Sequence, residues 1–207
     1  MNILLKYFPE LNQVQVDRYK SLVDLTMSWN QKINLVSRKD IEHLPERHIL
    51  HSLGIAVHAP ISPSTRILDV GTGGGFPGLP LAIMFPKTRF TLIDSIGKKV
   101  NVVKSIAAEL KLDNVRCLQI RAEDYKDGVD MVVSRAVTKL DRFTTWVAPN
   151  LRHKPRKGSG IWYLKGGDLD EEVKSFRGTK IFELRDVFSE AFFETKKLVW
   201  LPPEALK

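Results

Sequence analysis

A glycine-rich loop directly follows an apolar segment early in the chain. The segment Arg66 to Val70 runs into Gly71-Thr72-Gly73-Gly74-Gly75-Phe76-Pro77-Gly78. Glycines let the backbone approach a ligand closely, and in an α/β sheet the ligand lies beyond the carboxyl ends of the strands. With Asp69 before it, the loop suits a cofactor carrying an amino acid moiety, whereas a dinucleotide loop directs backbone amides at a pyrophosphate. A flexible turn without a ligand is the alternative.

Polar residues also follow the next two apolar segments. Asp94 comes 23 residues after Gly71, where an acid can accept both ribose hydroxyls of an adenosine-containing ligand. Capping of the next helix is its alternative role. The glycine loop resembles the first motif of class I methyltransferases, in which a small and a polar residue at the positions of Ala122 and Glu123 usually frame the adenine. A solvated loop acid is the simpler interpretation of Glu123.

Arg135 lies in Ser134-Arg135-Ala136 at the end of a fourth apolar segment. We therefore expect it in the cleft where cofactor and substrate meet, with an ion pair to Asp69 or Asp94 as the alternative. The chain has neither the Asn-Pro-Pro-Tyr segment of exocyclic amine methylases nor a Pro-Cys nucleophile. What remains is a nucleophile that needs no activation. The guanine N7 lone pair is one, because it can attack a sulfonium methyl in line by positioning alone.

Composition limits the other possibilities. The net charge of +8 favours encounters with polyanions, although a merely soluble basic protein has the same property. No apolar stretch approaches the roughly 18 residues of a membrane span, and no signal sequence is evident, so we expect a cytoplasmic protein. Cys117 is the only cysteine and is expected to be a small core residue of a buried strand. His48 and His51 lack a carboxylate or cysteine to complete a metal site, so no metal is expected.

The elements that position these residues fall into two regions. Residues 1–60 are expected to form a helical extension, with apolar residues at helical spacing from 11 to 35 and a second helix from 41 to 58. Residues 61–207 alternate short apolar segments with helices, which predicts βαβ units and a parallel sheet in an α/β domain. The expected strands are 66–70, 89–93, 115–120, 128–134, 161–164 and 197–201, and the expected helices are 78–85, 98–110, 140–150 and 168–176.

In order along the chain, seven motifs resemble the RsmG (GidB) family of 16S rRNA guanine-N7 methyltransferases. They are Trp29-Asn30 with Asn34-Leu35, Arg47-His48 with His51-Ser52-Leu53, Asp69 to Gly78, Asp94-Ser95 with Lys98-Lys99, Ala122-Glu123, Ser134-Arg135-Ala136, and Lys165-Gly166. The family often has proline at the position of Gly74 and aspartate at that of His51. Neither departure removes a cofactor contact.

This resemblance implies a Rossmann-like class I fold that uses S-adenosylmethionine (SAM), preceded by an N-terminal helical extension. It also implies methylation of one guanine in the 530 loop of small-subunit rRNA. The SAM contacts that it implies are Gly71, Phe76, Ala122, Glu123 and Arg135. From the loop itself we add Asp69, Gly73, Gly75 and Asp94 to the expected cofactor site.

Three groups of basic residues are candidates for an rRNA-binding rim, with solvated surface charges as the alternative. They are Arg38, Lys39, Arg47 and His48 in the extension; Lys98 and Lys99 at a helix start; and Arg152, Lys154, Arg156 and Lys157 in a turn-rich loop. We expect Arg47, His48, Lys98, Lys99 and Lys165 to bind substrate. Arg135 and Lys165 are expected to position the reacting groups without a general base.

Two other functions remain open from the sequence alone. One is a SAM-dependent methyltransferase acting on another RNA such as tRNA, on a protein or on a small molecule. The other is a non-catalytic nucleic-acid-binding protein of the same fold. The expected partner is 16S rRNA, either bare or within the small ribosomal subunit, and the expected oligomeric state is a monomer.

Overall fold

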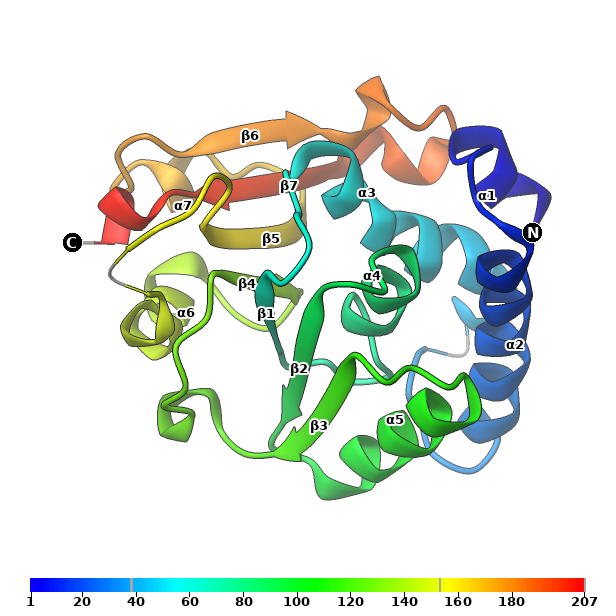
Figure 1. The fold of residues 1–207 in the computed structure, drawn as a ribbon. Helices are drawn as coiled ribbons and strands as arrows, with labels where there is room; N and C mark the ends of the chain where they lie inside the picture. The colour runs from blue at the N-terminus through cyan, green and yellow to red at the C-terminus, as the bar shows by residue number, and fades with distance from the viewer. Residues whose placement is uncertain (38, 153, 207) are drawn as a thin grey trace.

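The computed structural model describes residues 1–37, 39–152 and 154–206, which form an α/β fold around one seven-stranded sheet (Figure 1). The strand order is β3-β2-β1-β4-β5-β7-β6, and every strand is parallel to the others except β7, which is antiparallel to both of its neighbours. The strands are β1 Arg66–Val70, β2 Arg89–Asp94, β3 Val115–Gln119, β4 Met131–Arg135, β5 Gly160–Gly166, β6 Lys180–Glu183 and β7 Lys196–Leu201.

Helices cover both faces of this sheet because each central strand is apolar on both sides. One face packs Ile67, Met131 and Val133 against the N-terminal helices and against α4 and α5. The other face packs Leu68 and Val132 against α6. The helices are α1 Asn2–Tyr7, α2 Gln13–Asn30, α3 His51–His58, α4 Gly78–Met84, α5 Gly97–Glu109, α6 Leu140–Val147 and α7 Asp170–Val173.

Short irregular helices complete the chain. A π-helical turn at Pro45–Leu50 runs straight into α3. Three-residue 3-10 helices lie at Ile41–His43, Ala122–Asp124, Ala148–Asn150 and Leu184–Asp186, and longer ones at Ala191–Thr195 and Pro203–Leu206. None of the helices in the described residues has the length and apolar character needed to cross a membrane.

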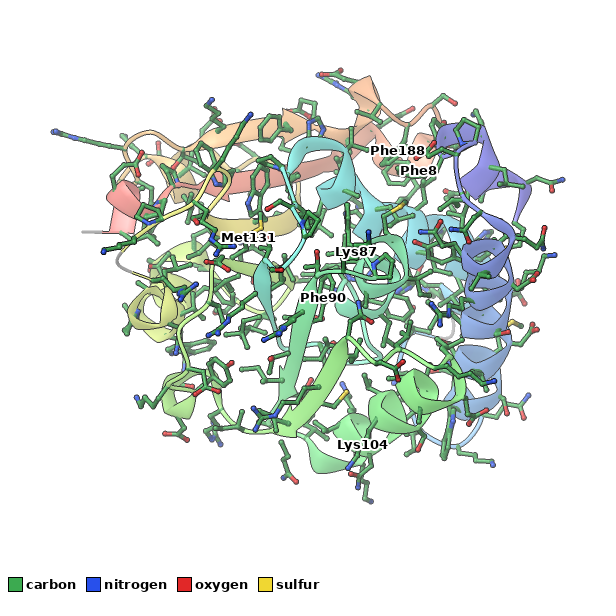
Figure 2. The ribbon with its side chains drawn as sticks, in the orientation of Figure 1. Phe8, Lys87, Phe90, Lys104, Met131 and Phe188 are labelled. Carbon is green, nitrogen blue, oxygen red and sulfur yellow. The ribbon has the colours of Figure 1, made fainter. Side chains whose placement is uncertain are left out.

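The N-terminal helices pack into the same hydrophobic core as the sheet. Leu4, Tyr19 and Leu53 are fully buried with the sheet residues. Figure 2 shows Phe8 beside Phe188, and the neighbouring Tyr7 ring meets Phe188 edge-on at 4.9 Å between centroids. The first helix is thereby attached to the segment between β6 and β7.

The expected Rossmann-like α/β fold is confirmed, and the six expected strands are all present within two or three residues at their ends. Among the α-helices and strands of the described residues, α1 and β6 were not predicted, and the helix expected over 168–176 forms only at α7. The strand order reverses between β1 and β4, and ligands in such sheets bind beyond the carboxyl ends of the strands at this reversal.

Candidate active site

The glycine loop is held from inside by the carboxylate of Asp69. One of its oxygens accepts hydrogen bonds from Thr72 Oγ1 at 2.7 Å and from the backbone N–H of Gly78 at 2.8 Å. The side chain is fully buried, and this burial raises its pKa to about 7. Asp69 therefore fixes the shape of the loop and does not face an open pocket.

Asp94 ties the same loop to the end of β2. Its carboxylate accepts from the backbone N–H of Gly73 at 3.0 Å and from that of Ile96 at 2.9 Å. Helix α5 begins only at Gly97, with Ile96 as its N-cap residue and no side-chain cap. The alternative role of Asp94 as a helix cap is therefore wrong: it orders the turn before the helix.

A pocket of about 440 Å³ opens beside the loop, and we call it the glycine-loop pocket. Its walls come from the carboxyl ends of β1 and β2, from the segments that follow β1 to β4, and from α5 and α6. It is lined by Val70, Gly71, Ile93, Asp94, Ser95, Ile96, Lys99, Ile120, Arg121, Ala122, Glu123, Val137, Arg142 and Trp146. The lining combines the carboxylates of Asp94 and Glu123 with the half-exposed apolar side chains of Ile96 and Val137, which suits the sugar and the ring of a nucleoside.

Gly71 is required by this pocket's geometry. Its φ of +68° lies in the left-handed region, and a Cβ there would come within 2.5 Å of Cγ2 of Val137. A side chain at this position would strain the backbone and collide with the pocket wall at the same time.

A second pocket, of about 480 Å³, lies beyond the ends of β4 and β5, and we call it the arginine pocket. It is lined by Asp40, Arg47, His48, His51, Arg135, Ala136, Leu164, Lys165, Gly166, Asp168, Leu169, Glu172, Phe192 and Lys196. Four cationic side chains therefore surround it, together with the aromatic ring of Phe192. The cation of Lys196 lies 4.7 Å, and that of Arg47 5.7 Å, from the centre of this ring.

Arg135 is fixed by contacts with the N-terminal region. Its guanidinium donates to Nδ1 of His48 at 2.8 Å and to the backbone oxygen of Arg47 at 3.3 Å, and it lies 5.4 Å from the centre of the Phe76 ring. Because Arg135 is always a donor, Nδ1 of His48 is the acceptor and the ring proton is on Nε2. Burial and the charge of Arg135 lower the pKa of His48 to about 3, so this imidazole is neutral at pH 7.

The alternative of an ion pair from Arg135 to Asp69 or Asp94 is wrong in the described part of the chain. Its side-chain hydrogen bonds go to Arg47 and His48 instead. The guanidinium keeps its charge at neutral pH, although burial lowers its pKa to about 10.

The carboxylates of the arginine pocket are already engaged. Glu172 accepts from Nζ of Lys165 at 2.5 Å, and Asp40 accepts from Arg47 at 2.8 Å. Asp168 accepts from the backbone N–H of Asp170 at 3.0 Å. Lys165 also donates to the backbone oxygen of Thr138 at 3.3 Å, so both it and Glu172 are held in place.

The two pockets share one short segment of backbone. Arg135 and Ala136 line the arginine pocket, and the next residue, Val137, lines the glycine-loop pocket. The turn between them has Ala136 at a φ of +53°, an uncommon conformation for a residue with a side chain. A group in one pocket is thereby brought next to a group in the other.

The predicted site residues fall into three groups: those that line the glycine-loop pocket, those that line the arginine pocket, and those that line neither. Gly71, Asp94, Ala122 and Glu123 line the glycine-loop pocket; Lys99, expected to bind substrate, also lines it. Arg47, His48, Arg135 and Lys165 meet in the arginine pocket. Asp69, Gly73, Gly75 and Phe76 line neither pocket and lie in or beneath the loop, and Lys98 is exposed outside both pockets.

Sequence reasoning missed several pocket residues, including Asp40, Glu172, Phe192, Lys196 and Val137. Phe192 and Lys196 precede or begin β7 and reach the pocket only through the pairing of β7 with β5. No local motif marks such a contact. Ala136 and Val137 directly follow Arg135, and this adjacency was the one feature of the sequence that could have placed them near the site.

The prediction that the three groups of basic residues form one rim is wrong. Arg152 and Arg156 pair with Asp130, at 3.3 and 3.9 Å, just before β4 begins, which places the basic loop at the amino edge of the sheet. Arg38, which belonged to the same expected rim, lies outside the described residues. Lys39, Lys154 and Lys157 are exposed.

Two further expectations concern metals and Cys117. Among the described residues, no three histidine, cysteine or acidic side chains are grouped to hold a metal ion. Cys117 lies on β3 as expected, but it is only partly buried because β3 is the edge strand. Burial nevertheless raises the pKa of its thiol to about 11, which keeps it protonated.

Solved structures share the fold. The structure of MtNAS in complex with MTA and tNA aligns with a TM-score of 0.61 and 14% identity, over 87% of this chain and 71% of that one. Fibrillarin from Aeropyrum pernix, solved with bound SAM, aligns with a TM-score of 0.55 and 16% identity over 75% of each chain. At these identities the similarity shows the fold alone.

Sequence comparisons are more specific. The family model "rRNA small subunit methyltransferase G" matches residues 15–199. The ribosomal RNA small subunit methyltransferase G of Flavobacterium johnsoniae is 51% identical over 204 residues, 98% of each chain. That of Cytophaga hutchinsonii is 51% identical over 205 residues, 98% of this chain and 99% of the relative. The chain therefore belongs to the rRNA small subunit methyltransferase G family, whose members are SAM-dependent methyltransferases.

Proposed function

We propose that this protein methylates N7 of one guanine in the 530 loop of 16S rRNA, with SAM in the glycine-loop pocket and the guanine in the arginine pocket. The observation that carries the proposal is the Arg135-Ala136-Val137 segment, which lines both pockets. Methyl transfer needs a donor and an acceptor held in contact, and neighbouring pockets on one backbone segment meet that need.

The residues of the glycine-loop pocket fit SAM. All four predicted cofactor residues that line it have a role in the proposed complex: Asp94 would accept the ribose hydroxyls, Ala122 and Glu123 would flank the adenine, and Gly71 would let the backbone approach the ligand. When bound, SAM supplies the electrophilic sulfonium methyl. Asp69 and Gly73 support this site from behind through the hydrogen bonds that fix the loop, and the backbone N–H of Phe76 donates to the backbone oxygen of Thr72 within it.

The arginine pocket fits a base that needs no deprotonation. Its carboxylates are paired or hydrogen-bonded, and the imidazole of His48 is neutral and committed to Arg135. Guanine N7 already has a free lone pair, so no general base is required. Phe192 offers a ring for stacking, and Arg135 and Lys165 offer donors to O6 of the guanine, which leaves the N7 lone pair free to attack.

We propose residues 1–60 as a helical extension that supplies Arg47 and His48, and residues 61–207 as the SAM-binding domain. The order of elements supports this division, since the chain is helical up to α3 and its first strand begins at Arg66; the contacts of Arg135 with Arg47 and His48 then join the two parts at the pocket. A monomer suffices, because both pockets are built from one chain.

Deletion of the gene followed by mass spectrometry of 16S rRNA tests the proposal. We expect the strain to lose one methyl group from a guanine of the 530 loop, and a plasmid copy of the gene to restore it. Loss of a methyl group from tRNA or a protein, with the 530 loop unchanged, would instead favour another methyltransferase substrate. Purified protein that fails to bind SAM in calorimetry would favour a non-catalytic protein of the same fold.

A further inference from the structure

A third groove of about 470 Å³ lies at the amino edge of the sheet, at the opposite ends of the strands from both active-site pockets. Figure 2 marks this edge with Lys87 and Phe90 at the start of β2 and Met131 at the start of β4. Three arginines line the groove, Arg66, Arg89 and Arg116, one from each of β1, β2 and β3. The proposed methyl transfer does not use this groove.

The groove exists because the connection between β3 and β4 contains little helix. The chain between β3 and β4 forms only the 3-10 helix Ala122–Asp124, so no full helix covers β2 and β3 on this side (Figure 1). The buried ring of Tyr125 and the residues Asp127 to Val129 form the opposing wall. The amino ends of the three strands are left open to solvent.

Strand register places the three arginines on the same face of the sheet. Arg66 is the partner of Arg89 across β1 and β2, and Arg116 is the partner of Thr91, which shares a face with Arg89. Neighbouring strands are about 4.8 Å apart, so the three side chains form a short row across the sheet. All three are exposed.

The charges of this row are largely free. Arg66 and Arg89 make no ion pair within the described residues, and Arg116 lies 3.8 Å from Asp127 with both side chains exposed. Asp113 also lines the groove.

The basic loop, which carries Arg152 and Arg156, lies beside the groove, because a Cβ on Gly128 of the groove wall would come within 3.3 Å of the Arg152 side chain. Arg152 and Arg156 share the one carboxylate of Asp130, so cations outnumber carboxylates on this edge.

We propose that this groove and the adjoining basic loop bind the phosphodiester backbone of the rRNA substrate at a second place, away from the methylated base. A row of exposed guanidinium groups is suited to phosphate oxygens, and such contacts position a nucleic acid without reading its sequence. A five-residue strand spans roughly 15 Å, so the proposed contact lies at least that far from the pocket of the methylated base. This inference rests on the proposed function.

Neutralising the three arginines tests the second contact. The variant is Arg66→Gln/Arg89→Gln/Arg116→Gln, and its control with the same change of charge is Lys20→Gln/Lys104→Gln/Lys174→Gln at exposed positions that do not line the groove. Binding to 16S rRNA is measured over a range of salt concentrations. Each lost phosphate contact lowers the slope of log affinity against log salt by about 0.7 to 0.9. We expect the arginine variant to lose about 2 units of slope relative to the control and to raise KM for 16S rRNA with kcat unchanged.

Two outcomes separate this inference from the proposed function. A salt slope and KM equal to those of the lysine control overturn the second contact while leaving the methyltransferase function intact. Wild-type protein that neither binds nor methylates 16S rRNA overturns the proposed function itself. Should the triple variant fail to fold, Arg89→Gln alone is used, because its exposed side chain makes no hydrogen bond or ion pair within the described residues. We expect it to lose just under 1 unit of slope.

Discussion

Arg135 is the residue that connects the two halves of the proposed chemistry. It is held by Arg47 and His48 from the N-terminal region and begins the segment that separates the two pockets. It could be singled out from the sequence by its place at the end of a strand. Its partner His48 could not be assigned to it, because they are 87 residues apart and meet only in the fold.

We expect Arg135→Ala to lower kcat about 100-fold, because loss of a positioning contact misplaces the reacting groups. Arg177→Ala, which removes an exposed arginine outside both pockets, is the control. Initial rates of methyl transfer to 16S rRNA measure the effect, and calorimetry with SAM shows whether the variant is folded. Equal rates for the two variants would refute the role of Arg135.

His48 gives a pH-dependent prediction. Its pKa is about 3 in the folded protein against a usual value of about 6.5, so the unfolded chain takes up the proton first as the pH falls. The stability that depends on neutral His48 is therefore present above pH 6.5 and is lost at lower pH. We expect the stability advantage of wild type over His48→Gln to shrink by about 2 kcal/mol between pH 7 and pH 5. Denaturant unfolding at each pH measures it, and a constant difference would contradict the assignment.

The glycine loop of this strand-to-helix element is constrained at Gly71 both by backbone conformation and by contact with its neighbour, and a comparison with Gly167 separates the two effects. Gly71 has a positive φ and also lies against Val137, whereas Gly167 has a φ of +79° with nothing within 4 Å of an added Cβ. Gly167→Ala therefore introduces backbone strain alone. We expect Gly71→Ala to weaken SAM binding at least 10-fold, since strain of about 1 to 3 kcal/mol and a steric collision fall in the pocket wall. Calorimetry should show wild-type affinity for Gly167→Ala, and equal affinities for both variants would show that the loop does not form the site.

The fold was largely predictable from the sequence because its central strands are short, apolar and separated by turn residues, as at Arg66 to Val70. β6 was missed because its four residues, Lys180–Glu183, are only partly buried and show little apolar pattern. The cofactor side of the site was also predictable, since Gly71, Asp94 and Ala122 each follow a strand. The basic loop was misplaced because it precedes β5, and the loop before a parallel strand joins the amino edge of the sheet, opposite the two pockets.

At the scale of the whole molecule, the N-terminal helices are part of one core. Tyr7 Oη donates to Glu190 at 2.8 Å and accepts from the backbone N–H of Ser189 at 2.8 Å, which joins α1 to the chain just before β7. We therefore expect one cooperative thermal transition, with equal calorimetric and van't Hoff enthalpies. Tyr7→Phe should lower the stability by about 2 kcal/mol and move the entire transition, because the lost hydrogen bond involves a charged group. Two separate transitions would contradict a shared core.

In the proposed reaction the two pockets together transfer a methyl group from SAM to one guanine N7. The direct measurement is incubation of the purified protein and methyl-labelled SAM with bacterial 16S rRNA or small subunits that lack the modification, followed by mass spectrometry of the labelled RNA. The predicted result is label in 7-methylguanosine at one position of the 530 loop, formed by wild type and lost with Arg135→Ala. Label in any other nucleoside, or equal labelling by wild type and Arg135→Ala, would contradict it.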